Sequence, residues 1–273
     1  MQTTRNHPGE DPHDSQIPQY SLTKTLLVWA AAAIPMGVLG WVVAPRVAST
    51  SGKPGFERLA VLAVGLIWQC ALVLLLLYQE AGTLRWSTIS QRLWLQAPHT
   101  PQTGEPRRWL WCWLIPLAAV TAIYQLRVMG MLQRVWVSLF PFLAEPAGFS
   151  FGSSLNDPVV RSQLVDNWGV LLLLVVSGLF NTVLGEELLF RGLLLPRMSG
   201  TFREWDWAAN GVLFGSYHLH QPWGMLGSAI QGMFLFALPS RYFRSSWFGI
   251  VAHSGQTVYL TVLMLGLVLG LAR

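Results

Sequence analysis

The sequence predicts an all-α, polytopic membrane protein, a bundle of about seven transmembrane helices. Of the 273 residues, 52% are hydrophobic and only 11% are charged, whereas ordinary soluble domains carry roughly 25% charged residues. So few charges cannot cover a soluble protein of this size, and a disordered chain would show low hydrophobicity and high charge. In a bilayer each segment must satisfy its own backbone polar groups, so a run of about 20 apolar residues predicts a spanning helix.

Seven apolar stretches have the composition of spanning helices. Several of them begin with Trp, which is enriched at membrane interfaces. The fourth stretch can continue as a helix until Pro196, because proline ends or kinks a helix. The predicted spans are residues 22–44, 59–78, 109–128, 168–196, 207–220, 224–238 and 247–271.

The predicted spans divide the chain into three regions. Residues 1–21 are polar and predict an N-terminal tail, and the first apolar run is too long for the core of a cleaved signal peptide. Residues 22–164 form an N-terminal transmembrane region. Residues 165–273 form a C-terminal transmembrane domain that carries most of the polar motifs.

Two segments of the N-terminal transmembrane region are harder to place. The amphipathic segment 84–95 is expected to lie on the membrane surface. Residues 131–149 are apolar but contain Pro141 and Pro146. We expect this second segment to be interfacial or re-entrant, with an eighth span as the alternative.

The net charge of +5 does not predict a nucleic-acid-binding protein, because Lys and Arg occur singly between apolar stretches and form no basic stripe. The same residues predict the orientation, since short cytoplasmic loops carry an excess of Lys and Arg. The N-terminal tail is therefore expected in the cytoplasm, on the same side as four arginines of the C-terminal loops: Arg197, Arg203, Arg241 and Arg244.

The fourth span contains three ionisable residues, each of which costs a few kcal/mol at the bilayer centre. Glu187 and Arg191 are four residues apart and therefore meet on one helix face. Glu186 points about 100° away from Glu187 and has no partner on its own helix. We expect Glu187 and Arg191 to support Glu186.

Two later spans contribute histidines at a similar depth. His218 ends the run Phe214 to His218, and His253 and Thr257 lie four residues apart on one face of the last span. Glu186, His218 and His253 lie roughly 15, 16 and 9 Å along their helices from the face that carries the arginines, at about 1.5 Å per residue. The three side chains are therefore expected to share one layer.

The pattern E-E-x-x-x-R, then F-x-x-x-H, then a final helix with His resembles the CAAX protease and bacteriocin-processing family of intramembrane proteases, also called the abortive-infection family. The resemblance covers about residues 165–268. It implies that Glu186 and His218 activate the hydrolytic water and that His253 helps to hold the oxyanion. Members usually carry Asn, or sometimes Asp, where this chain has Thr257, whose hydroxyl offers one donor instead of two.

The resemblance implies an intramembrane endopeptidase that cleaves a membrane-associated, prenylated or leader peptide in a cavity open to the cytoplasmic half of the membrane. We expect an integral protein of a bacterial cytoplasmic membrane, with lipid and a peptide or protein substrate as its partners. Zinc is a candidate cofactor, with Glu186, His218 and His253 as candidate ligands. The sequence contains no H-E-x-x-H motif, so metallo-type and glutamate-type mechanisms both stay open, as does the oligomeric state.

Two other functions compete with this interpretation. A non-catalytic membrane protein of the same fold could act as an immunity or scaffolding partner, and Thr257 is the feature that favours it. A transporter could use intramembrane charges as an ion path. The transporter is weakened by the lack of an internal repeat and by the clustering of the charges in one half of the chain.

Overall fold

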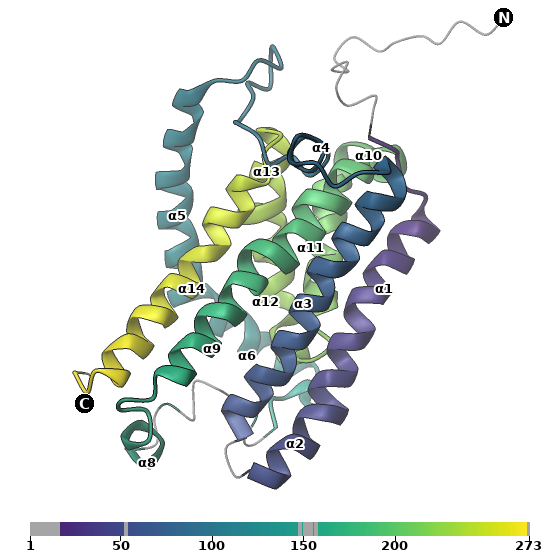
Figure 1. The fold of residues 1–273 in the computed structure, drawn as a ribbon. Helices are drawn as coiled ribbons and strands as arrows, with labels where there is room; N and C mark the ends of the chain where they lie inside the picture. Colours follow the sequence, from purple (N-terminus) through teal and green to yellow (C-terminus); the bar gives the residue numbers. More distant parts are fainter. Residues whose placement is uncertain (1–16, 52–53, 147–148, 150–154, 156–157, 272–273) are drawn as a thin grey trace, which may run out of the picture.

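The computed structural model describes residues 17–51, 54–146, 149, 155 and 158–271. Within these ranges the regular structure is helical, apart from one isolated β-bridge between His99 and Pro106. The long helices run side by side as a bundle (Figure 1). The predicted all-α, polytopic fold is therefore confirmed.

In the described part of the chain, five helical segments are long and apolar enough to cross a membrane. They are Leu22–Ala48, Phe56–Ala81, Arg108–Leu139, Trp168–Arg197 and Trp247–Val268. The first two lie within the segments formed by α1 (Leu22–Val38), η2 (Leu39–Val43), α2 (Ala44–Ser51) and α3 (Pro54–Ala81). The third contains η3 (Arg108–Trp113), α5 (Leu114–Ile123), η4 (Tyr124–Val128) and α6 (Met129–Leu139). The last two contain α9 (Trp168–Leu179), η6 (Phe180–Gly185), η7 (Leu188–Leu194), η8 (Leu195–Arg197) and α14 (Trp247–Val268).

The other two predicted spans form shorter helices inside the bundle. Residues 207–220 correspond to α11 (Asp206–Tyr217), whose 12 residues extend about 18 Å, less than the roughly 30 Å of the hydrocarbon core. Residues 224–238 correspond to α12 (Met225–Gln231) and η11 (Gly232–Ala237), which α13 (Leu238–Tyr242) continues. These helices pack against α11.

The third long helix corrects the prediction for residues 131–149. The helix does not end near Val128 but continues through η4 and α6 to Leu139. The apolar run continues the helix because its first proline is Pro141, which begins the short turn η5 (Pro141–Leu143). Residues 131–139 are therefore part of the third span and form neither a re-entrant segment nor an eighth span. The amphipathic segment contains the short helix α4 (Trp86–Arg92).

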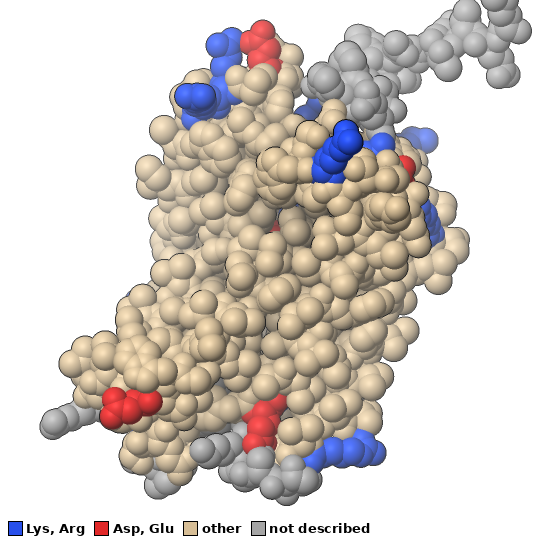
Figure 2. Space-filling model, in the orientation of Figure 1, with Lys and Arg blue, Asp and Glu red and all other residues tan. Residues whose placement is uncertain are grey.

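Charged side chains mark the two ends of the bundle. On the face shown in Figure 2, Lys, Arg, Asp and Glu gather at both ends, and a broad band between them is almost free of charge. At the N-terminal end, the Glu80 carboxylate accepts hydrogen bonds from the Tyr20 hydroxyl and from Arg197, whose Nη2 lies 2.8 Å away. This arrangement is that of an integral membrane protein.

The contact between α11 and the α12–η11 segment depends on two glycines. A Cβ atom on Gly215 would lie 2.5 Å from the Cβ atom of Ala229 and 2.7 Å from its Cα atom. Gly211 faces the backbone of Met233 in the same way. Small residues allow this close approach of membrane helices, and here they bring the C-terminal end of α11 into the bundle.

We expect Gly215→Ala to destabilise the fold by about 1–3 kcal/mol, because the added methyl group forces α11 away from α12. Gly255→Ala is the matched control, since a Cβ atom on Gly255 would have no neighbour within 4 Å and alanine favours the helix. Thermal unfolding of the purified protein in detergent measures both effects. Equal unfolding midpoints for the two variants would contradict the close contact.

Candidate active site

Glu186 and Glu187 lie in the fourth long helix, between the π-helical segments η6 and η7. π-Helical turns inside α-helices are frequent at functional sites. Gly185 precedes the two acids, and a Cβ atom there would lie 2.9 Å from the Leu66 carbonyl oxygen. This glycine therefore lets α3 pack closely beside the two carboxylates.

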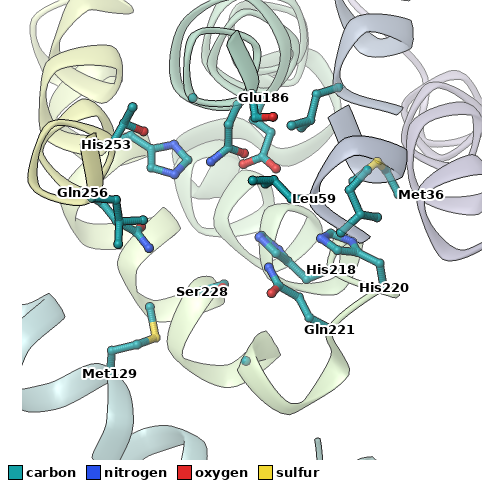
Figure 3. Close-up of a pocket in the computed structure, with 18 of the residues that line it drawn as sticks. Met36, Leu59, Met129, Glu186, His218, His220, Gln221, Ser228, His253 and Gln256 are labelled. Atoms are coloured by element: carbon teal, nitrogen blue, oxygen red, sulfur yellow. The ribbon is translucent and has the colours of Figure 1, made fainter. Parts of the chain in front are cut away.

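One cavity of about 470 Å³ brings the sequence-predicted site residues together. Its lining includes Glu186, His218, His253 and Thr257, which come from the fourth long helix, the end of α11 and α14. Figure 3 shows Glu186, His218 and His253 pointing toward the same space. The first three of the four are almost fully buried.

Tyr217 holds the Glu186 carboxylate. The Tyr217 hydroxyl accepts a hydrogen bond of 2.5 Å from Gln69 Nε2 on α3 and donates its own proton toward Glu186. Tyr217 is fully buried. Sequence reasoning missed this residue, although its position directly before His218 was a signal.

Within the residues that the structure describes, one ring nitrogen of His218 is bonded to the protein and the other is left for a ligand. Its Nδ1 atom lies 2.8 Å from the Phe214 carbonyl oxygen. A carbonyl oxygen only accepts, so Nδ1 carries the proton and Nε2 of the neutral ring is an acceptor. α11 ends at Tyr217, and His218 caps it, so the ring sits where the chain leaves the helix.

Glu187 contacts His253 and Arg191. Its Oε1 atom lies 3.0 Å from Arg191 Nη1 and 3.0 Å from His253 Nδ1, and all three side chains are buried. The hydrogen bonds of Glu187 lead to Arg191 and to His253 on α14. The turn of about 100° between successive residues directs Glu186 toward Tyr217 and Glu187 toward α14. A supporting role of Glu187 and Arg191 for Glu186 stays a prediction.

Thr257 lies against Gly178 of α9. A Cβ atom on Gly178 would lie 3.3 Å from Thr257 Oγ1. Within the described part of the chain the Thr257 hydroxyl has no hydrogen-bond partner, and the side chain lines the cavity. The hydroxyl can therefore donate to a bound ligand.

The candidate zinc ligands do not form a metal-binding group in this structure. Among the described residues, no cluster of three or more His, Cys, Asp or Glu side chains has a suitable arrangement. Glu186, His218 and His253 share the cavity but do not converge closely enough on one point.

The cavity extends from Glu186 toward the end of the bundle opposite the N-terminal segment. Its lining there includes Arg58, near the start of α3, and the exposed Glu145, whereas the Tyr20 amide bonds to the Arg197 carbonyl at the other end (Figure 1). Desolvation raises the pKa of Glu145, and the positive charge of Arg58 opposes this rise. The prediction that the cavity opens toward the face with the C-terminal arginines is therefore wrong, because α3 and the segment after α6 form its mouth.

On the side away from the open end of the cavity, tightly packed buried side chains close the site. Phe190, Arg191 and Phe236 have no exposed surface. The Arg191 guanidinium carbon lies 4.1 Å from the ring centre of Phe214 and 5.0 Å from that of Phe236. Its Nη2 atom donates to the Gly232 carbonyl oxygen at 3.3 Å. The guanidinium is thus enclosed by aromatic rings.

Fold and site together define an integral membrane protein with a buried polar cavity between its helices. Residues 167–259 match the family model described as type II CAAX prenyl endopeptidase Rce1-like. The match covers about a third of the chain and includes all four sequence-predicted residues of the cavity. It confirms the family resemblance expected from the motifs and supports a CAAX-type intramembrane endopeptidase in general. No curated protein and no solved structure matches the chain.

Proposed function

We propose that this protein is an intramembrane endopeptidase that hydrolyses a peptide bond with a water activated by Glu186. The observation that supports this function best is the meeting of Glu186, His218, His253 and Thr257 on one buried cavity. A carboxylate, two imidazoles and a hydroxyl supply a proton acceptor and hydrogen-bond donors for hydrolysis. All four residues lie in the segment that matches the endopeptidase family.

In the first step, Glu186 takes a proton from a water that also donates to Nε2 of His218. The Phe214 carbonyl fixes the His218 ring with Nε2 as its acceptor, and Tyr217 fixes the carboxylate. The resulting hydroxide attacks the carbonyl carbon of the scissile bond. General base catalysis of this kind contributes roughly 10²- to 10⁴-fold to a rate.

In the second step, His253 and Thr257 donate hydrogen bonds to the oxyanion of the tetrahedral intermediate. His253 Nδ1 is bonded to Glu187, so Nε2 is the ring nitrogen that remains for the oxyanion. Protonated Glu186 then returns its proton to the leaving amine. Donors placed at a developing oxyanion are worth roughly 10²- to 10³-fold each.

The substrate we propose is a membrane-associated peptide that reaches the cavity from the face opposite the N-terminal segment. One wall of the cavity consists of apolar side chains from α1 and α3, among them Met36, Leu59 and Leu62. Such a wall suits a peptide with an attached lipid chain, and the family is described as a type II CAAX prenyl endopeptidase. A leader peptide with an apolar segment is the second substrate class. We place the protein in a bacterial cytoplasmic membrane.

The test compares peptide termini across the proteome of cells that carry the intact protein or the Glu186→Ala variant. We expect a set of new termini in membrane-associated proteins only with the intact protein. Glu204→Ala is the matched control, because Glu204 is an exposed carboxylate outside the cavity, and it should give the same termini as the intact protein. Identical termini in Glu186→Ala cells would contradict the proposal and favour a non-catalytic immunity or scaffolding protein.

A further inference from the structure

One wall of the cavity comes from the third long helix, which lies outside the segment that matches the endopeptidase family. Gln125, Met129 and Gln133 of this helix line the cavity. They are spaced four residues apart, so they follow one side of the helix. All four proposed catalytic residues lie inside the matched segment 167–259. The chemistry and this wall therefore come from different parts of the chain.

Hydrogen bonds on both sides of this wall fix it in place. The Tyr124 hydroxyl donates to the Gly227 carbonyl oxygen at 2.8 Å, and Trp136 Nε1 donates to the Pro222 carbonyl oxygen at 3.0 Å. Both acceptors belong to the short helical turn before α12 or to α12 itself. The side chains of Gln125 and Gln133 are thus held toward the cavity without forming these anchoring bonds themselves.

The amides on this wall have few partners. Gln125 Oε1 lies 3.5 Å from Gln231 Nε2, which is the long limit of a hydrogen bond. Within the described residues, Gln133 and also Gln256 of α14, on another side of the cavity, have no hydrogen-bond partner. Unpaired amides are costly inside a membrane. A ligand with both donors and acceptors would satisfy them.

We propose that Gln125, Gln133 and Gln256 bind the backbone of an extended peptide segment and hold it across the catalytic residues. A protease must expose the scissile bond, and unwinding a substrate helix in a membrane leaves its N–H and C=O groups unsatisfied. A glutamine amide offers one carbonyl acceptor and two N–H donors, which match a peptide group. This inference rests on the proposed function and assigns peptide binding to three amides, of which Gln125 and Gln133 lie outside the family match and Gln256 lies inside it.

The experiment uses the purified full-length protein in lipid nanodiscs and a synthetic peptide that spans the most abundant Glu186-dependent cleavage site. The variant is Gln125→Met with Gln133→Met, which keeps side-chain length but removes both amides. We expect KM to rise roughly fivefold for each lost hydrogen bond, with kcat almost unchanged. Leu126→Ala is the control, because Leu126 lies on the same helix and is 70% exposed. Equal unfolding midpoints verify that all variants fold.

A second peptide, with one backbone amide near the cleavage site replaced by an ester, tests the contact itself. The ester lacks an N–H donor, so it should raise KM with the intact protein and raise it much less with the double variant. An unchanged KM in the double variant, or an equal ester effect in both proteins, would overturn this inference. The amides would then bind water in the cavity and not the peptide backbone. In that case the peptide is still cleaved, so the proposed function stands. Absence of any Glu186-dependent cleavage would instead contradict both.

Discussion

Replacing Glu186 by Gln is expected to lower the rate of peptide hydrolysis by roughly 10²- to 10⁴-fold, the usual contribution of a general base. Glutamine keeps the size of the side chain and its contact with Tyr217 but cannot take a proton from water. Cleavage of the synthetic peptide by the purified protein measures the effect. The exposed Glu204, changed to Gln, is the control and should leave the rate unchanged.

His218→Ala in the Glu186→Gln background extends this test. Catalytic groups that act as a unit show strongly non-additive losses, and the proposed mechanism has both residues acting on the same water. The double variant should therefore lose little more activity than Glu186→Gln alone. Losses that multiply would show that His218 acts in a separate step, and full activity of Glu186→Gln would remove Glu186 from the mechanism.

Replacing Arg191 by Met is expected to destabilise the fold by about 3–5 kcal/mol, the usual cost of leaving one charge of a buried ion pair unpaired. Arg191 and Glu187 are completely buried, with Nη1 and Oε1 3.0 Å apart. Methionine fills much of the space between Phe214 and Phe236 but leaves the Glu187 carboxylate facing only His253. Thermal unfolding in detergent, with the Glu204→Gln protein for comparison, measures the loss.

Adding Glu187→Gln to Arg191→Met should restore part of the lost stability. The second change removes the uncompensated charge and keeps an oxygen that can accept from His253 Nδ1. The two effects should be coupled by at least about 1 kcal/mol, as expected for residues in one polar network. Additive effects would mean that the ion pair does not stabilise this layer. A single variant as stable as the intact protein would lead to the same conclusion.

The long helices could be predicted from the sequence because length and apolarity alone determine whether a segment can span a bilayer. The extent of the third helix could not be predicted. This helix continues past the end of the first apolar run and stops just before Pro141. The short helix α11 is similar in composition to a span. Its 12 residues are accommodated only because Gly211 and Gly215 let it pack deep among longer helices.

The candidate site was predictable where its residues share a motif on one helix or repeat a family spacing, as for Glu186, His218 and His253. Contacts between helices could not be predicted from the sequence, because they depend on how the helices are rotated and packed. Three features belong to this group: the hydrogen bond from His253 Nδ1 to Glu187, the contact of Tyr217 with Gln69, and the wall of Gln125 and Gln133. The direction of the cavity was missed for the same reason.

Phe190, Arg191 and Phe236 form a closed layer next to the site. The cavity therefore ends at this layer and does not continue through the protein. Water can reach Glu186 from one side of the bilayer without forming a continuous column to the other. A cavity that ends at this layer lets water enter the interior of the membrane protein without opening a path along which ions could cross the bilayer.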